Sequence, residues 1–211
     1  MATVGVESIE VWILEDGEKW DDQNTCLNGN TSSGSGTKKC NHFKIDGKEN
    51  ASGVINVKVD GLSSDPNVVF ASNKPAYTSF GSPSPKADVE LLDIPLAMQA
   101  AILGQTATDN TFTIGSEIKP PHVVVEMIGN DIKGGKQHVV FPKAIASVTS
   151  EEMSTKEEKG ADPKTQSITF TALTDSEGNM VYKAYDPSGT GSGDGFTYTT
   201  FQEKWLKKKG A

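Results

Sequence analysis

Two cysteines and a histidine form the first candidate site in the sequence. Cys26, Cys40 and His42 lie in one polar stretch, and thiolate and imidazole groups are common zinc ligands. A structural zinc site needs four ligands, usually with a close cysteine pair, whereas these cysteines are 14 positions apart. Three states stay open: two unpaired thiols, a disulfide that closes the loop, and a metal site. Unpaired thiols fit best, and we expect no metal and no other cofactor.

The remaining catalytic inventory of the sequence is small. His122 and His138 flank one expected hairpin, where a solvent-facing or cross-strand position suits them better than catalysis. A glycine-rich run at 189–195 has the composition of a phosphate loop, but it lacks the Gly-Lys-Ser/Thr ending and the dinucleotide-binding spacing. No nucleophile elbow or zinc-protease motif is present in the sequence. We therefore predict no catalytic residues and no enzymatic activity.

The charge of the chain argues against nucleic-acid binding. Its 211 residues include 28 acidic and 20 basic side chains, the net charge is −8, and every basic side chain is a lysine. Arginine supplies the two-pronged contact to guanine and phosphate, so its absence weighs against sequence-specific recognition. The negative net charge weighs against nonspecific binding. We expect DNA that passes this surface not to adhere to it.

Length and composition predict one domain with long polar extensions. The chain is long enough for a sizeable core, yet only 35% of its residues are hydrophobic. We expect a single domain over residues 1–211, with a flexible Gly/Ser/Asn-rich loop or arm at about 15–53 and a carboxyl-terminal extension at about 187–211. The sequence has neither a long apolar run nor the layout of a secretory signal, which favours synthesis in a cytoplasm without membrane contact.

Most of the secondary structure that the sequence predicts is β-strand. Apolar alternation favours strands at 6–14, 54–60 and 88–92, and a hairpin with strands at 123–128 and 137–146. Segments 168–173 and 180–185 are predicted to form a second hairpin. Prolines between 66 and 85 indicate irregular chain in that stretch. A short strand is expected around Phe43 and Ile45.

One segment, 93–105, predicts a helix. Asp93 suits the N-cap, Pro95 the first turn, and Gly104 the left-handed closing position. Because nearly all side chains between these residues are apolar, the helix must pack against a sheet or a neighbouring subunit. The residues thus describe a β-rich body with one buried helix and several polar arms, which suits a protein that functions by assembling.

Six motifs follow one another along the chain in a fixed order. They are MATVGV at 1–6, ADVELLDIPLAMQAAILG at 87–104, the hairpin from PHVVV at 121–125 to FPK at 141–143, EEMSTK at 151–156, TQSITFT at 165–171 and GNMVY at 178–182. In this order the chain resembles the major tail proteins, or tail tube proteins, of long-tailed, non-contractile bacteriophages. The resemblance covers residues 1–14 and 87–185.

The resemblance implies a fold and a role. The fold would be mainly β with one helix (α+β), in which two packed antiparallel sheets form a sandwich or barrel flanked by the helix. The protomers would assemble in the host bacterial cytoplasm as hexameric rings that stack into the virion tail tube, through which the genome leaves the capsid. Further partners would be the tape measure protein and the tail terminator or distal tail proteins. Six copies would carry 6 × −8 = −48, which suits DNA that passes the lumen without specific binding.

Eight residues are the candidate contacts between subunits or rings. They belong to the apolar helix, the polar arm, the EEMSTK motif and the tryptophans: Trp12, Asn28, Gly34, Ile102, Glu151, Glu152, Lys156 and Trp205. Deleting 28–36 is expected to preserve the fold and weaken ring stacking, because this tract supplies little apolar surface.

Two other functions fit the same residues. A monomeric β-sandwich adhesion or carbohydrate-binding module on a phage or cell surface would use the aromatic rings of Trp12, Trp20 and Trp205. A tube protein of a contractile or secretion apparatus would assemble into a tube through the same kinds of contact. Electron microscopy or sedimentation of the purified protein separates an assembling chain from a monomeric binding module.

Overall fold

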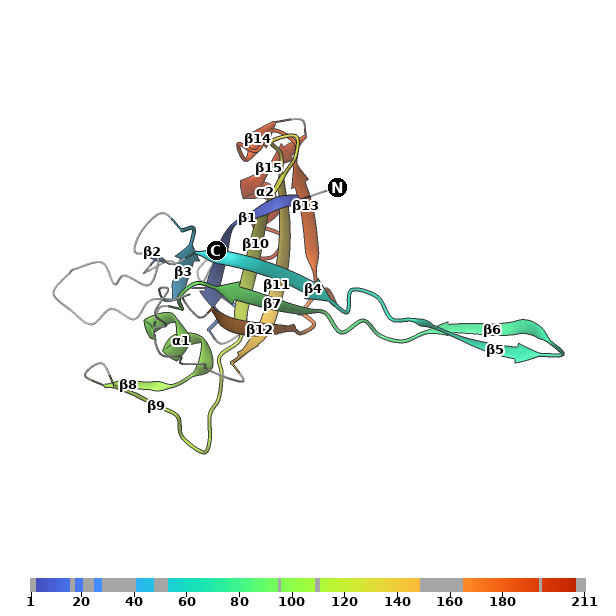
Figure 1. The fold of residues 1–211 in the computed structure, drawn as a ribbon, viewed down its shortest axis with the longest axis horizontal. Coiled ribbons are helices and arrows are strands. Elements are labelled where there is room, and N and C mark those ends of the chain that lie inside the picture. Colours follow the sequence, from blue (N-terminus) through green and yellow to red (C-terminus); the bar gives the residue numbers. More distant parts are fainter. Residues whose placement is uncertain are drawn as a thin grey trace, which may run out of the picture.

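The computed structural model is a β-rich body from which one long hairpin projects (Figure 1). The structure describes residues 3–15, 18–20, 25–27, 41–47, 53–94, 96–108, 111–148, 165–193 and 195–207. The strands are β1 (Thr3–Ile13), β2 (Thr25–Leu27), β3 (His42–Ile45), β4 (Val54–Asp60), β5 (Pro66–Ala71), β6 (Lys74–Phe80), β7 (Lys86–Leu91), β8 (Thr106–Thr108), β9 (Thr111–Thr113), β10 (Val123–Asp131), β11 (Lys136–Ser147), β12 (Gln166–Ala172), β13 (Tyr182–Asp186), β14 (Ser192–Gly193) and β15 (Phe196–Thr197). The helices are α1 (Leu96–Leu103) and α2 (Tyr198–Gln202).

One nine-stranded sheet forms the body. Its strands run in the order β2-β3-β1-β10-β11-β12-β7-β4, and β13 pairs with β11 beside this path. All pairings in it are antiparallel except that of β2 with β3. Three two-stranded sheets, β5-β6, β8-β9 and β14-β15, stand apart from it. The chain is therefore mainly antiparallel β, as predicted.

Strand β11 changes partner along its length, which overturns one prediction. Residues 136–140 pair with β13, whereas residues 144–147 pair with β12. The change falls at Pro142, which has no N–H to donate, and the pairing with β10 also skips from Phe141 to Ala144. The predicted hairpin of 168–173 with 180–185 is therefore wrong, because β12 and β13 both pair with β11 instead of with each other. Apolar alternation alone could not distinguish these pairings.

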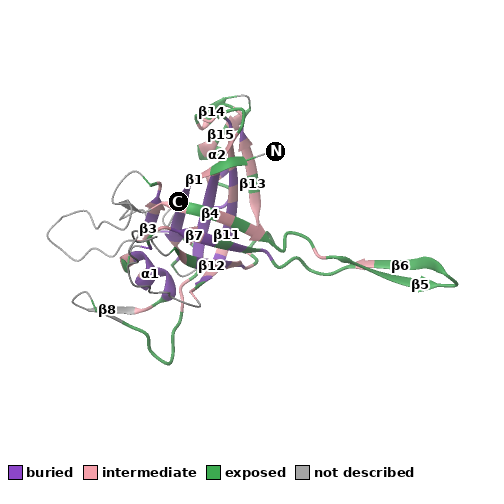
Figure 2. Cartoon of the chain, in the orientation of Figure 1, coloured by how far each residue is buried: buried purple, intermediate pink, exposed green. Residues whose placement is uncertain are grey.

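Two layers enclose the main core. Strands β1, β3 and β10 supply one wall, β7 and β12 supply the other with α1, and β11 joins the two. Figure 2 shows the buried positions concentrated in these strands and in α1. The largest fully buried side chains of this core are Phe43, Phe141, Phe170, Ile9, Ile45, Leu91, Met98, Ile102 and Ile168. The expected α+β sandwich is thus confirmed, and in the described residues the layers do not close into a barrel.

A second apolar cluster covers the opposite face of the first wall. Alternate residues of β1, β10 and β11 point there, among them Trp12, Val124 and Val140. The carboxyl-terminal segment packs over them through Phe201 and Trp205. Helix α2 in this segment is an addition to the one helix predicted. The carboxyl-terminal aromatic residues thus belong to the core of the protomer.

Helix α1 is shorter than predicted and ends at the expected glycine. Gly104 has a φ of 66°, and a Cβ there would lie 2.5 Å from the backbone oxygen of Lys119. The backbone N–H of Gln105 donates to the carbonyl of Ala100 and closes the helix at 2.9 Å. Met98, Ile102 and their neighbours are buried against the sheet. Neither helix in the described ranges is long and apolar enough to cross a membrane.

Irregular chain was predicted between 66 and 85, but β5 and β6 form a regular hairpin over the first part of this stretch. Ser72 and Asn73 make the turn with φ values of 52° and 61°, as a two-residue type I′ turn requires. Pro66 stands at the first position of β5, and Pro75 lies where the pairing shifts between Val69 and Phe70. Proline is tolerated at such positions because both strands of a two-stranded ribbon are edge strands.

Candidate assembly surfaces

Among the residues that the structure describes, the β5-β6 hairpin, called the arm below, carries the largest group of exposed large apolar side chains. It comprises residues 66–80 and projects away from the body (Figure 1). The exposed fractions of its large apolar residues are 37% for Val68, 50% for Val69, 66% for Phe70, 63% for Tyr77 and 72% for Phe80. A two-stranded hairpin with no third layer is marginally stable in water. The arm therefore has the character of a segment that is completed by contact with another surface.

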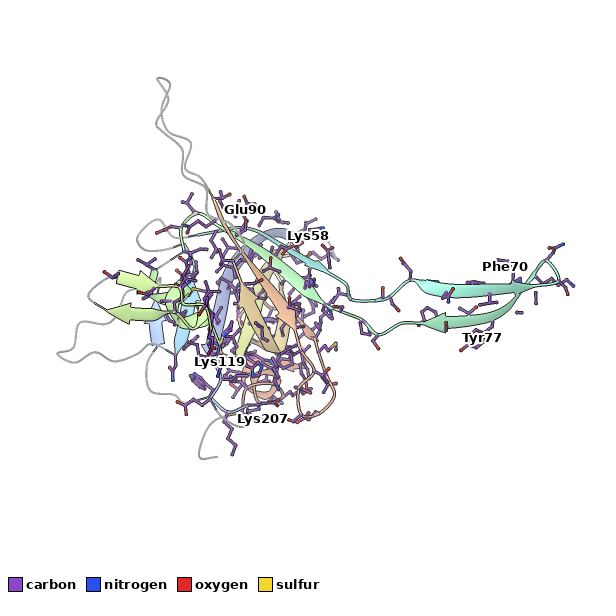
Figure 3. All side chains as sticks on the ribbon, turned by 90° about the horizontal axis from the view of Figure 1, so that it is seen from below. Lys58, Phe70, Tyr77, Glu90, Lys119 and Lys207 are labelled. Atoms are coloured by element: carbon purple, nitrogen blue, oxygen red, sulfur yellow. The ribbon has the colours of Figure 1, made fainter. Side chains whose placement is uncertain are left out.

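The apolar side chains lie on both faces of the arm. Val69 pairs with Tyr77 across the arm, so their side chains share one face. Phe70 follows Val69 in β5 and points to the opposite face, which it shares with Phe80 through the Pro66–Phe80 pair. Figure 3 shows Phe70 and Tyr77 far from the body, near the tip of the arm. A ribbon that is apolar on both faces suits a place between two surfaces.

The base of the arm is fastened to the body by backbone contacts. The N–H of Ser84 donates to the carbonyl of Gly61 at 3.1 Å, and the Oγ of Ser64 donates to the carbonyl of Gly81 at 2.7 Å. Gly61 has a φ of 70°, and a Cβ at this position would lie only 2.1 Å from the oxygen of Ser84. The arm is thus continued directly from the paired strands β4 and β7, which fixes the direction in which it leaves the body.

An open cleft of mixed polar and apolar lining lies beside β4. Its volume is about 420 Å³, and it is lined by β1, β4, β10, β11 and β13. Val4 and Ile55 at its rim are 69% and 49% exposed, whereas Met127 at its floor is buried. Among the described residues that line it, Lys183 alone is charged.

The outer face of β4, β7 and β12 is polar. Lys58 lies 2.6 Å from Asp60, and the hydroxyl of Thr169 donates to Asp88 at 2.6 Å. The hydrogen bond and the negative charge of Asp60 raise the pKa of Lys58. Figure 3 shows Lys58 and Glu90 on this side of the body. This surface, unlike the arm and the cleft, is ordinary hydrated sheet.

Three of the eight predicted contact residues are described, and all three are buried within the protomer. Trp12 and Trp205 are 1% and 4% exposed, and Ile102 of α1 is fully buried. Trp12 stacks on His42 with ring centroids 4.5 Å apart and meets Trp205 edge to face at 5.4 Å. The other five predicted residues lie outside the described ranges: Asn28, Gly34, Glu151, Glu152 and Lys156. For all eight, a role in contacts between subunits stays a prediction.

The sequence analysis missed the arm and the cleft. Val68, Val69 and Phe70 form a β-favouring run, and Ala76, Tyr77 and Thr78 form a second one, with two turn residues between them. This signal was available, but the prolines outweighed it because Ser-Asn is a weaker turn signal than Asn-Gly. The cleft depends on how β4 lies against β1, which a linear sequence does not display.

A buried polar cluster fastens the carboxyl-terminal segment to the sheet. The hydroxyl of Tyr198 donates to Oε2 of Glu126 at 2.5 Å, and Nδ1 of His138 lies 2.8 Å from Oε1 of the same carboxylate. Because a carboxylate only accepts, Nδ1 of His138 carries the proton that it donates. Burial, followed by the charge of Glu126, raises the pKa of Tyr198, so its phenol stays protonated and able to donate. His138 thus takes the cross-strand position, one of its two expected roles.

Glu10 is the centre of a second polar cluster, on the same face of β1 as Trp12. Its carboxylate lies 3.1 Å from Nε2 of His42 and 2.7 Å from Nζ of Lys44. Burial raises the pKa of Glu10, but the hydrogen bonds from His42 and Lys44 outweigh burial, and the net pKa is lowered. His42 is therefore engaged with Glu10 and Trp12. Cys40 lies outside the described residues, so the three states considered for the cysteines stay open.

The described clusters have structural explanations. No group of three or more His, Cys, Asp or Glu residues in the described part of the chain could hold a metal ion. The two polar clusters connect strands to one another and to the carboxyl-terminal segment. Within the described ranges, the arm is the place where several large apolar side chains are exposed together.

A β-sandwich with an apolar arm that no described residue covers is typical of a structural protein that associates with other protein surfaces. Residues 1–209 match the model of the phage tail tube protein family, and the chain belongs to that family. Membership gives the chain a structural role in the tail tube of a bacteriophage virion, where copies of the protein assemble with one another. No curated protein matches the chain at a significant level.

Proposed function

We propose that this chain polymerises as hexameric rings that stack into the phage tail tube, the conduit through which the genome leaves the capsid. The observation that carries the proposal is the arm. Its five large apolar side chains have no partner surface within the described protomer, and they lie on both faces of the ribbon. A contact with neighbouring copies would remove these side chains from water, at about 25 cal/mol for each Å² buried.

The direction of the arm supports repeated assembly. The arm leaves the body in line with β4 and β7, and each six- or seven-residue strand spans about 20 Å. It therefore reaches well beyond the body of its own protomer (Figure 1). A contact between an arm and a different surface on the next copy repeats from copy to copy, and such contacts produce rings when they close and filaments when they do not.

The charge of the chain supports passage of DNA. Six copies would carry 6 × −8 = −48, and none of the 20 basic residues is an arginine. A tube of this composition would repel the DNA backbone more than it holds it, so the genome would move through the lumen without specific binding.

The remaining assignments follow from this role. The chain acts without catalysis as one tail tube domain, and it assembles in the bacterial cytoplasm before it becomes part of the virion tail. Its further partners are the tape measure protein and the tail terminator or distal tail proteins. The 28–36 tract contributes to stacking, and its deletion is expected to weaken stacking while leaving the unfolding midpoint unchanged.

Sedimentation over a concentration series, followed by electron microscopy, tests the proposal. The purified chain is expected to form rings and then tubes as its concentration rises. A stable monomer that binds glycans would contradict the proposal and favour an adhesion or carbohydrate-binding module. Assembly into tubes only around or within a separate sheath would indicate a contractile apparatus.

A further inference from the structure

We propose that residues 196–207 are a strap that opens and closes as one unit over the face of the sheet formed by β1, β10 and β11, and that Asp186 and Glu126 hold it closed. The strap comprises β15, α2 and the turn that follows, and it packs on the sheet through Phe201 and Trp205. Its position decides whether the apolar side chains beneath it meet water. The inference concerns a single protomer and stands apart from the way in which copies assemble.

Few backbone hydrogen bonds join the strap to the body. Strand β15 pairs with β14 in the preceding loop, and neither strand belongs to the nine-stranded sheet. In the described ranges, two further backbone bonds tie the strap down: Tyr198 N–H donates to the carbonyl of Gly191, and Trp20 N–H donates to the carbonyl of Lys207, both at 2.9 Å. Opening of the strap therefore breaks no strand pairing of the main sheet.

Two fully buried carboxylates hold the near end of the strap. The carboxylate of Asp186 accepts from the N–H and the hydroxyl of Ser188 at 3.0 and 2.7 Å, and from the N–H of Gly191 at 2.6 Å. Gly191 accepts from Tyr198 N–H, and the hydroxyl of Tyr198 donates to Glu126 at 2.5 Å. One path of hydrogen bonds thus runs from Asp186 through the strap to Glu126.

Both carboxylates depend on donors that the closed arrangement supplies. Burial raises the pKa of Asp186, but the hydrogen bonds from Ser188 and Gly191 outweigh burial and lower it, so the side chain is ionised at neutral pH. Lys136, the cross-strand neighbour of Asp186, pairs with Glu7 instead. A buried carboxylate that loses such donors is costly, and this cost opposes opening.

The closed strap also leaves buried polar atoms without a partner. Among the described residues, no hydrogen-bond partner meets Nε1 of Trp205 on the strap or Nε2 of His138 beneath it. The His138 ring lies 5.6 Å from that of Phe196 and 5.9 Å from that of Phe201, measured between centroids, so the strap covers it. Opening would give both atoms access to water, which offsets part of the lost apolar contact. The strap is therefore held less firmly than the sheet beneath it.

Opening would expose a second apolar surface of the protomer. The strap covers Trp12, Val124 and Val140, each at most 1% exposed. They lie on strands whose opposite face belongs to the main core. Because that core is closed by other strands and by α1, it would stay intact while the strap is open. The strap thus controls whether this surface is available for contact.

Amide exchange of the dilute wild-type chain at pH 7, resolved to single residues, tests whether the strap is one unit. The N–H groups of residues 203–206 form hydrogen bonds within the strap, and that of Trp20 bonds to Lys207 from a distant part of the sequence. All five are expected to share one free energy of opening and to exchange roughly tenfold or more faster than amides of β10. Rates graded toward the end of the chain, as in fraying, or equal to those of β10, would overturn the strap.

Asp186→Asn tests the carboxylate, because it removes the charge and keeps the size. Exchange in the strap should become roughly tenfold faster or more, and binding of a hydrophobic dye should rise, while exchange in β12 stays unchanged. Asp131→Asn is the matched control: Asp131 accepts from the hydroxyl of Tyr185 at 2.9 Å, outside the strap, and its variant should behave as the wild type.

Two outcomes of the variant experiment would overturn the proposal. Wild-type exchange in the Asp186→Asn strap would show that Asp186 does not hold it. Equal acceleration of the strap and β12 would show one cooperative domain without a separate strap. If Asp186→Asn does not fold, Tyr198→Phe removes the bond to Glu126 instead, and the same comparison of strap and β12 decides.

Discussion

Phe70 and Tyr77 lie on opposite faces of one two-stranded arm, and both side chains are more than 60% exposed. Large aromatic rings rarely face water on both sides of a ribbon that has no layer to cover it. This arrangement supports the proposal that the arm is a contact between copies of the chain.

Substituting both aromatic residues should block assembly without harming the fold. Phe70→Asp with Tyr77→Asp places a charge on each face of the arm, and each charge would have to leave water if the arm were buried. The free energy of unfolding should change by less than about 0.5 kcal/mol, because the arm does not belong to the core. Sedimentation should show monomers, whereas Asn67→Asp, on a polar position of the same arm, should still assemble. Normal tubes from the aromatic double variant would exclude the arm as a contact.

Helix α1 offers a matched pair of substitutions for the core. Ile102 is fully buried and Leu96 on the same helix is 51% exposed. Ile102→Asp buries an unpaired carboxylate and should abolish soluble folded protein, whereas Leu96→Asp should fold normally. Circular dichroism and yield of soluble protein distinguish the two. A normally folded Ile102→Asp protein would show that this face of the helix can reach water.

The hydroxyl of Tyr198 should contribute measurably to stability. Its removal in Tyr198→Phe leaves the buried Glu126 carboxylate with one donor fewer, which should cost about 1–3 kcal/mol of unfolding free energy. Tyr185→Phe removes a hydroxyl that donates to Asp131 at 2.9 Å in a less buried position, and its effect should be clearly smaller. Urea unfolding of both proteins measures the difference. Equal effects would mean that the Glu126 cluster does not fasten the carboxyl-terminal segment.

The Glu10 cluster predicts a loss of stability in acid. The pKa of Glu10 is lower in the folded chain than its ordinary value near 4.5, so the folded state holds the ionised form preferentially. The stabilisation that the ionised Glu10 contributes is fully present above pH 4.5, the pKa of an ordinary glutamate. It is lost as the pH falls through the lowered pKa of Glu10 in the folded chain. Glu10→Gln should therefore be less stable than the wild type at pH 7, by about 1–3 kcal/mol, and the gap should narrow below pH 4.5. A gap that is constant with pH would contradict the ion-pair explanation.

The sequence predicted those elements whose signals are local. Alternation of Ile, Val and polar residues located β4 at 54–60 exactly as the structure has it, and Gly104 marked the end of α1. The two strands of the 123–146 hairpin were also correct in type and in pairing. In each case one short segment contains both the apolar pattern and the residue that ends it.

The errors arose where pairing depends on distant segments. The β12 and β13 strands were located correctly, but their partner is β11, whose change of partner at Pro142 has no signature in β12 or β13 themselves. Trp12 and Trp205 were proposed as subunit contacts; both are buried in the protomer, where their rings meet edge to face, and their role between subunits stays a prediction. The exposed apolar hairpin was not predicted, because its prolines favoured irregular chain in that stretch.

Amide hydrogen exchange of the arm tests the central claim most directly. Exchange of the peptide that spans residues 62–81 would be measured in dilute monomer and in sedimented tubes. If copies bury the arm, its amides should exchange at least tenfold more slowly in the tubes, while peptides of the buried strand β10 should be protected in both states. Equal exchange of the arm in monomer and tube would contradict the account.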